Sequence, residues 1–462
     1  MRLGKLHLDN YRCFASIDVE LHPELTVFIA ENGQGKSTLL DAIRIALWPY
    51  VSSFDLARNA FNDPGNAIAV DDVRLLRLDS GDMARQLPTR VEMTGDFGSG
   101  QENTWIRYRD KETKQTKTKD DGATSFMRQW VGVIQNQIRD PAKPTLNLPV
   151  FGYYGTGRLW AQKRLTEATK GKDDTQETDF YVRTFAYLNC LDPASSYKHF
   201  KEWFIWAFGS YRELQIKQLE GSAAQVDITA ARERIEVVQQ VVDIFLRPTT
   251  GWHTLEYSVS HEKSLVLHHE KHGVLKVDAF SDGIRSVLAM VGDIAYRCIK
   301  LNPHLGAKAA LETQGVVLID EVDMHLHPSW QQTVLGQLRQ AFPRVQFIVT
   351  THSPQVLSTV KRENIRVIGL NREGQTIAEQ PLAMTYGEPS GLVMHSVMQV
   401  DPQPPVQEKH DLQRLTELVD QGDYAGTEAL ELTQKLNALL GEQHPQLQRL
   451  QRSIQRQKAL RG

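Results

Sequence analysis

The stretch that decides the fold is Ala30-Glu-Asn-Gly33-Gln-Gly35-Lys36-Ser37-Thr38. It matches the pattern GxxxxGK[ST], except that Ala30 replaces the first glycine, which is tolerated where the backbone does not need a positive φ. The apolar run 25–30 before it predicts a buried strand, and residues 37–46 after it predict a helix. In this context a glycine-rich turn points backbone N–H groups at an anion, so the sequence favours a phosphate-binding loop over a chance turn.

The side chains of the loop indicate which anion is bound. In such loops the lysine, here Lys36, contacts the β- and γ-phosphates of a nucleoside triphosphate, and the next hydroxyl, here Ser37, coordinates Mg²⁺. We therefore expect Mg-ATP as the ligand. The loop residues expected to bind it are Asn32, Gly33, Gln34, Gly35, Lys36, Ser37 and Thr38.

Two acids follow a second apolar run. Residues 315–321 read Gly-Val-Val-Leu-Ile-Asp-Glu, so Asp320 and Glu321 stand at the carboxyl end of a buried strand, where open α/β sheets bind their ligands. We expect Asp320 to hold Mg²⁺, directly or through water, and Glu321 to orient and activate the attacking water. Alone, the pair is as well explained by an exposed turn, but the phosphate-binding loop favours the metal site.

A histidine follows the next apolar run, 345–350, in the sequence Thr-Thr-His352-Ser-Pro. A lone histidine is more often structural. Here the spacing from Asp320 leaves room for one helix and one strand, which would return His352 to the same edge of the sheet. We expect it to hydrogen-bond the γ-phosphate or the attacking water.

A further candidate phosphate site lies ahead of the acids, in Phe280-Ser281-Asp282-Gly283. These residues begin a helix expected over 283–301, and its N-terminal amides with the Ser281 hydroxyl can bind phosphate. The helix stands far along the chain from the phosphate-binding loop, so it suits the nucleotide of a second protomer. An ordinary N-cap role for Ser281 explains this motif alone equally well.

Composition adds mainly exclusions. The chain has 462 residues, 24% charged side chains and a formal net charge of −3, which are typical of a globular protein without overall attraction to nucleic acid. Its three cysteines are far apart, which fits a reducing cytoplasm and excludes a disulfide framework or a CxxC-type zinc site. We expect no signal peptide, no membrane span and a cytoplasmic protein.

With these motifs in this order, the chain resembles the ABC-type ATPases of the RecF/SMC/OLD-like superfamily. KLHLDNYRCF at 5–14 is similar to the N-terminal strand of that family, FSDGIR to its signature, VVLIDE to Walker B, VDMHLHP to the D-loop and TTHSP to the H-loop. The resemblance implies two heads that enclose two ATP molecules, so that Ser281, Asp282 and Gly283 act in trans. It also implies a nucleotide-site arginine, assigned to Arg12, and a metal-contacting Q-loop glutamine, assigned to Gln162.

Within the superfamily, LPVFGYYGTGRLW, DEVDMHLHPSWQ and TTHSPQVLS are most similar to the PtuA family, the ATPases of the Septu anti-phage system, although retron-associated systems use the same core. That family works with a separate HNH nuclease of the PtuB type. We therefore expect such a partner, with DNA as a further candidate. The chain lacks the sustained heptads of an SMC arm, and residues 371–462 lack the DxD acids of a Toprim nuclease, so no nuclease centre is expected in it.

The expected fold class is α/β, an ABC-type P-loop NTPase with a helical lobe and a helical C-terminal tail. We expect an N-terminal ATPase lobe at 1–160, a helical insertion with return strands at 161–279, a C-terminal ATPase lobe at 280–400 and a helical interaction segment at 401–462. Within the insertion, a helical pattern over 180–246 is expected to end at Pro248.

Four weaker patterns leave alternatives open. His325 and His327 form an HxH pair, but a metal site needs another ligand, so the D-loop explanation is preferred. A basic run predicts a solvated hairpin or loop; its members are Arg107, Arg109, Lys111, Lys114, Lys117 and Lys119. A basic tail is either a solvated face or a contact with nucleic acid or an acidic partner; its members are Arg449, Arg452, Arg456, Lys458 and Arg461. An apolar stripe would pack on the ATPase core or form a protein interface; its members are Leu412, Leu415, Leu418 and Val419.

These features favour an Mg-ATP-binding ATPase that dimerises, or oligomerises further, and controls an HNH nuclease in anti-phage defence. The alternative is a RecF-like DNA-repair ATPase that binds DNA itself, which predicts DNA binding that weakens steeply with salt. A transporter subunit is disfavoured because the chain lacks the LSGGQ sequence.

Overall fold

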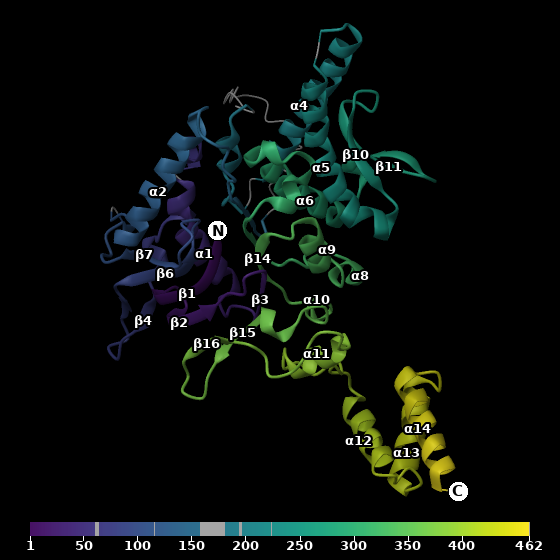
Figure 1. Cartoon of the computed structure of the whole chain (residues 1–462). Helices are drawn as coiled ribbons and strands as arrows, with labels where there is room; N and C mark the ends of the chain where they lie inside the picture. The colour runs from purple at the N-terminus through teal and green to yellow at the C-terminus, as the bar shows by residue number, and fades with distance from the viewer. Residues whose placement is uncertain (61–63, 115, 158–180, 194–195, 223, 462) are drawn as a thin grey trace. The chain divides into compact units, whose positions relative to one another are not determined.

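The computed structural model describes residues 1–462 apart from 61–63, 115, 158–180, 194–195, 223 and 462. The chain divides into two compact units, Met1–Val393 and Met394–Gly462 (Figure 1). The first unit contains the sheets and the candidate site, and the second is helical. The finer division predicted within the first unit, at residues 160 and 279, stays a prediction.

A six-stranded sheet forms the centre of the first unit, in the order β16-β15-β3-β14-β13-β9. Neighbouring strands pair in parallel except at β16, which is an antiparallel edge. The residues of β3, β9, β13 and β14 are buried throughout, which confirms the strands expected from apolar runs. The bounds are β3 Leu25–Ile29, β9 Val150–Tyr154, β13 Gly315–Ile319, β14 Val345–Thr350, β15 Ile365–Leu370 and β16 Thr376–Glu379.

A second, antiparallel sheet has the order β2-β1-β6-β7-β8. Gln346 on β14 joins the two sheets, because its side-chain amide accepts from Leu3 N and donates to Leu3 O, both at 2.8 Å. Helix α1, Lys36–Val51, contacts strands of both sheets, and α2, Gly122–Arg139, packs on α1 and β7. The bounds of the strands are β1 Arg2–Tyr11, β2 Phe14–Glu20, β6 Thr89–Asp96, β7 Asn103–Arg109 and β8 Lys119–Asp120.

The prediction of a solvated basic run is wrong for two of its members. Arg107 and Arg109 lie on β7 and are 4% and 3% exposed. The Arg107 guanidinium donates to the carbonyls of Ile45 and Asn66 and pairs with Asp120 at 2.9 Å. A guanidinium offers five donors, so each of these arginines can be buried by bonding backbone carbonyls of neighbouring loops.

The first unit also contains a helical lobe, in which α4, α5 and α6 pack on one another beside the sheet β10-β11-β12 (Figure 1). The expected stop at Pro248 is wrong by two residues, because α5 continues to Thr250 and ends at the left-handed Gly251. Pro248 cannot donate to the Ile244 carbonyl, and Gln337 Nε2 donates to that carbonyl instead, at 3.0 Å. The bounds are α4 Ser196–Leu219, α5 Gln225–Thr250, α6 Asp282–Leu301, β10 His253–Ser258, β11 Ser264–His269 and β12 Gly273–Lys276.

Shorter elements connect these layers. The α-helices are α7 Ala309–Glu312, α8 Pro328–Gln331, α9 Val334–Ala341, α10 Pro354–Leu357 and α11 Ser390–Ser396. The 3₁₀ helices are Asp55–Ala60, Pro64–Asn66, Val70–Asp72, Arg183–Tyr187, Val277–Ala279, Pro303–Lys308 and Arg362–Asn364. The strands β4 Leu75–Arg77 and β5 Met83–Arg85 form a separate hairpin.

The second unit contains the helices α12, Lys409–Asp420, α13, Thr427–Leu440, and α14, Pro445–Arg461. The stripe Leu412, Leu415, Leu418 and Val419 is buried against Ala429, Leu436, Leu447 and Leu450 of the other two helices. It therefore forms the core of its own unit, and both predicted destinations for the stripe are wrong. No helix in the described part of the chain is long and apolar enough to cross a bilayer.

Candidate nucleotide-binding site

The phosphate-binding loop joins β3 to α1 and has the left-handed turns that its glycines allow. Gly33 has φ 82° and Gly35 has φ 93°. A Cβ on Gly35 would lie 2.4 Å from Phe14 Cζ and 2.8 Å from Cys13 Sγ, so only glycine fits this position. Ala30 is not among the residues with positive φ, which is why alanine can stand at the first position of the motif.

The ammonium of Lys36 is held within this loop. Its Nζ donates to the carbonyls of Ala30, at 2.9 Å, and Glu31, at 3.1 Å. Burial lowers the pKa of Lys36, and the negative charges of Asp320 and Glu321 oppose that shift. The remaining loop residues Asn32 and Gly33 are exposed, and Gln34, Gly35 and Thr38 are partly exposed, as an anion-binding turn requires.

The first turn of α1 meets the end of β13 through one hydrogen bond. Ser37 Oγ donates to Asp320 Oδ2 at 2.7 Å, although 283 residues separate the two along the chain. Thr350 at the end of β14 donates to the other carboxylate oxygen, Asp320 Oδ1, at 2.6 Å. A hydroxyl and a carboxylate side by side are hard oxygen donors of the kind that Mg²⁺ binds, so these residues fit the expected metal.

The backbone conformation of Glu321 could not be predicted from the sequence. Its φ is 48°, in the left-handed region that non-glycine residues rarely adopt. Thr350 holds this conformation from the neighbouring strand, because its Oγ1 accepts the Glu321 N–H at 2.7 Å and its carbonyl accepts the Val322 N–H at 3.0 Å. Such strain, held in place by neighbouring bonds, is common at functional sites.

The segment after β14 returns to the same edge of the sheet. His352 is partly exposed there, directly after two buried threonines. Thr351 Oγ1 donates to Asp323, and Ser353 Oγ donates to Gln331 Oε1 at 2.7 Å, so the residues on both sides of His352 are tied to the segment that follows Glu321. Because β3, β14 and β13 are neighbours in the sheet, Lys36, Asp320, Glu321 and His352 all lie at the edge where the carboxyl ends of these strands meet.

The Ser281-Asp282-Gly283 motif lies at the start of α6 and has different neighbours. The Ser281 side chain makes no capping hydrogen bond, and Asp282 pairs with Arg285 of the same helix. A Cβ on Gly283 would lie 2.5 Å from the carbonyl oxygen of His325, in the segment after Glu321. Across the described residues, no hydrogen bond joins this motif to the phosphate-binding loop.

Arg12 lies beside α1 and not among the phosphate-loop contacts. Its guanidinium pairs with Asp41 at 2.6 Å and with Asp72 at 2.7 Å. Tyr153 at the end of β9 donates to the other oxygen of Asp41 at 3.0 Å. Asp41 and Tyr153 were not predicted; the tyrosine pair that ends an apolar strand in VFGYYG was the available indication.

The last two assignments concern Gln162 and the HxH pair. Gln162 lies outside the described residues. His327 Nδ1 accepts from Ser329 N as the N-cap of α8, and the described part of the chain contains no cluster of three or more His, Cys, Asp or Glu side chains able to hold a metal ion.

The chain matches known protein families over most of its length. A model described as AAA domain matches residues 5–238, about half of the chain, and a second AAA-domain model matches residues 173–358. The chain belongs to the AAA-domain family. The order of strands and motifs in this AAA-domain protein confirms the predicted α/β fold of an ABC-type P-loop NTPase.

Named relatives of the AAA-domain protein include a probable ATPase of a retron and a protein of the Septu system. Retron Ec83 probable ATPase of Escherichia coli is 26% identical over 510 residues, which cover 99% of this chain and 87% of the relative. Septu protein PtuA of Bacillus mycoides (strain KBAB4) is 34% identical over 112 residues, 24% of this chain and 15% of the relative. An SMC head bound to the C-winged helix domain of ScpA covers 82% of this chain and 98% of that head, with 14% identity and a TM-score of 0.48. The retron and Septu relatives and the AAA-domain match confirm the resemblance to RecF/SMC/OLD-like ATPases, PtuA among them.

Proposed function

We propose that this protein binds Mg-ATP at the edge formed by β3, β13 and β14 and hydrolyses it. The observation that carries the proposal is the chain of hydrogen bonds from Ser37 through Asp320 and Thr350 to the backbone N–H of Glu321, which supports Ser37 and Asp320 as metal ligands beside a catalytic acid. Phosphoryl transfer needs positioning and charge neutralisation more than covalent chemistry, and these residues supply both.

Each residue then has a defined task. Bound Mg²⁺, held by Ser37 and Asp320, would supply charge neutralisation at the β- and γ-phosphates. The loop amides and the Lys36 ammonium bind the phosphates and fix their orientation. Glu321 accepts a proton from the attacking water and holds that water in line, and His352 donates a hydrogen bond to the γ-phosphate.

The second half of the site comes from another protomer in this proposal. The Ser281 residue is exposed and its side chain makes no capping bond, and among the described residues it makes no hydrogen bond with the phosphate-binding loop of the same chain. They suit the γ-phosphate of an ATP held by a second copy. ATP binding would therefore favour a closed dimer, and hydrolysis would release it.

We further propose that this cytoplasmic dimer, or a larger oligomer built from it, controls an HNH nuclease in anti-phage defence. The support is the kinship with ATPases named for a retron and for the Septu system. Residues 394–462 form a compact unit of their own and are the candidate interaction segment.

The test combines hydrolysis with assembly. The full chain is co-expressed with a small HNH nuclease of the PtuB type, purified through a tag on the ATPase, and assayed for phosphate release and DNA cleavage. We expect a stable complex whose DNA cleavage responds to ATP or to AMP-PNP. An ATPase that never retains the HNH protein would contradict the nuclease role and leave the hydrolysis proposal standing.

The tail supports DNA as a second candidate partner. Arg449, Arg452 and Arg456 are exposed on α14 at helical spacing. If this face binds DNA, affinity should fall steeply with salt, and replacing one arginine should reduce the salt slope by about one. Binding that is absent, or unaffected by salt, would contradict it.

A further inference from the structure

A cavity of about 330 Å³ lies at the edge of the central sheet opposite the nucleotide site. Pro149 and Gln314 line it just before β9 and β13 begin, whereas the site residues follow the carboxyl ends of the same strands. Tyr50 lines it from the last turn of α1, the helix whose first residue is Lys36. At 1.5 Å per residue, Tyr50 lies about 21 Å along α1 from Lys36, so the cavity is a separate place in the fold.

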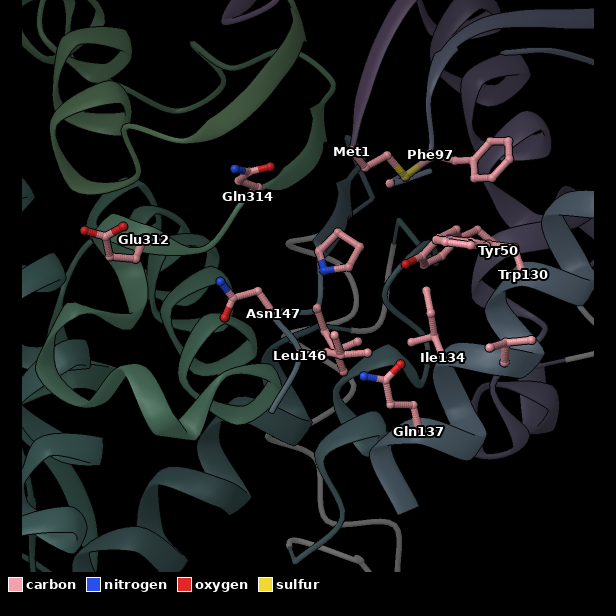
Figure 2. A pocket seen from close by; sticks show the side chains of 14 residues that line it. Met1, Tyr50, Phe97, Trp130, Ile134, Gln137, Leu146, Asn147, Glu312 and Gln314 are labelled. Atoms are coloured by element: carbon pink, nitrogen blue, oxygen red, sulfur yellow. The ribbon is translucent and has the colours of Figure 1, made fainter. Parts of the chain in front are cut away.

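One side of this cavity is apolar and rich in aromatic rings, and the polar side chains of Asn147, Glu312 and Gln314 line the other side (Figure 2). Tyr50, Phe97 and Trp130 come from α1, the turn after β6 and α2, and Ile134 and Leu146 close it between them (Figure 2). Tyr50 packs edge-on against Phe151 at 5.4 Å between ring centroids, and Phe97 against Trp105 at 6.0 Å, so these walls are braced by the core behind them. A volume near the lower end of the range for ligand pockets, about 300–1,000 Å³, suits one small ring system.

Two polar groups, the Tyr50 hydroxyl and the Gln137 amide, face into this space (Figure 2). Tyr50 is only 2% exposed, and no hydrogen bond of its hydroxyl is found within the described residues. The buried indole N–H of Trp130 also has no acceptor in the described part of the chain. Figure 2 shows the Tyr50 hydroxyl and the Gln137 amide turned inward, toward the space between Ile134 and Leu146.

The charge of the lining restricts the ligand. No lysine, arginine or histidine is among the described residues that line the cavity. Its one acidic member, Glu312, pairs with Arg344 at 3.0 Å. Burial raises the pKa of the Tyr50 phenol, so the hydroxyl stays a donor at neutral pH. The lining has no side-chain cation to pair with a phosphate, and burial lowers the pKa of the Met1 α-amino group, which disfavours its charged form. Both observations favour an uncharged ligand.

We propose that this cavity binds an uncharged heteroaromatic ring of nucleobase size. The aromatic walls provide stacking surfaces, which bind bases through their π faces. The Gln137 amide offers a donor beside an acceptor, the pair that matches N7 and the exocyclic amine of adenine. The Tyr50 hydroxyl adds a donor for a ring nitrogen (Figure 2). The proposal concerns a second site and does not depend on ATP hydrolysis.

The test titrates adenine into the full chain by calorimetry, with Mg²⁺ and AMP-PNP present to occupy the nucleotide site. We expect adenine to bind under these conditions. Gln137→Met keeps the side-chain length and removes two hydrogen bonds, which should weaken adenine by about tenfold or more. Tyr50→Phe keeps the ring and should weaken it about fivefold.

Asn136→Leu is the matched control, since Asn136 carries an exposed amide on the same helix and does not line the cavity. It should bind adenine like the unmodified chain. Adenine binding that AMP-PNP abolishes, or that Gln137→Met and Asn136→Leu leave equally unchanged, would overturn the proposal. Tighter binding of AMP than of adenine would also overturn it. So would a loss of affinity in Gln137→Met for single-stranded oligoadenylate but not for adenine. Thermal unfolding of each variant checks that the fold is intact.

Discussion

The two phosphate-binding halves of this protein differ in how they are connected. The half built from the phosphate-binding loop, β13 and β14 is closed by bonds within one chain, from Ser37 through Asp320 and Thr350 to Glu321. The half at the start of α6 has no such bonds to the loop among the described residues, and its Ser281 is exposed. The difference supports the proposal that one protomer supplies the first half of each site and a second protomer supplies the other half.

The segment after Glu321 touches both halves. Asp323 accepts from Thr351 after β14, and the His325 carbonyl lies against Gly283 of α6. His325 itself has φ 62°, a second left-handed residue close to Glu321. Under the proposed function, this segment is the part of the chain through which the two halves would influence each other.

The largest effect is expected at Glu321. Glu321→Gln keeps the shape and removes the base, so we expect kcat for ATP hydrolysis to fall about 10²–10³-fold while ATP binding is retained. Phosphate release and equilibrium ATP binding measure the two quantities. Glu373→Gln, at an exposed glutamate of a turn, is the control and should hydrolyse ATP normally. Equal losses of binding and hydrolysis in Glu321→Gln would contradict a role in the chemical step.

The next effect separates two glycines of the same loop. Gly35→Ala adds a Cβ 2.4 Å from Phe14 Cζ at φ 93°, so we expect the free energy of unfolding to fall by about 3 kcal/mol and ATP binding to be lost. Gly33 has a similar φ of 82°, but a Cβ there would meet no atom within 4 Å. Gly33→Ala should therefore cost only about 1–2 kcal/mol of backbone strain. Urea unfolding of the two variants checks this order, and equal losses would show that the contact with Phe14 does not matter.

A smaller effect is expected at the second half. Ser281→Arg places a bulky cation on an exposed residue, so ATP binding by the separate protomer should change by less than about twofold, while AMP-PNP-dependent dimerisation should weaken about tenfold or more. Sedimentation with and without AMP-PNP measures the dimer. Normal dimerisation would contradict the role given to α6.

The smallest expected effect is the uptake of a fraction of a proton by Lys36 when ATP binds. Burial lowers the pKa of Lys36, so part of the population is neutral at alkaline pH, and phosphate favours the charged form. Binding of ATP at alkaline pH should therefore take up protons, measured by calorimetry in buffers of different ionisation enthalpy. Lys36→Arg, whose guanidinium stays charged, should take up fewer. Equal uptake by both chains would remove Lys36 from the binding step.

The sequence predicted the sheet and the first half of the site because local patterns specify them. Apolar runs such as 315–319 indicate buried strands, and the residues that follow parallel strands meet at one edge. Features that depend on contacts between distant segments were not predictable in this way. Asp41 bonded to Arg12 and Tyr153, and Arg107 buried against Ile45 and Asn66, are set by tertiary packing.

Backbone conformation was equally hidden. Nothing in the residue type predicts φ 48° at Glu321, because glutamate rarely adopts it and the neighbouring Thr350 imposes it. The cavity around Tyr50 is assembled from α1, α2 and the starts of two strands, so no single stretch indicated it. The same holds for the stripe at 412–419, whose partners lie on two later helices.

One mixing experiment tests the central claim, that the ATP site is completed by two protomers. Lys36→Ala disables the phosphate-binding loop and Ser281→Arg disables the start of α6, and each variant alone should hydrolyse ATP poorly. If the halves combine in trans, a mixed dimer has one site with both defects and one with neither. The account predicts that mixing the two inactive variants restores a substantial part of the hydrolysis. No recovery, in a mixture shown to contain mixed dimers, would contradict it.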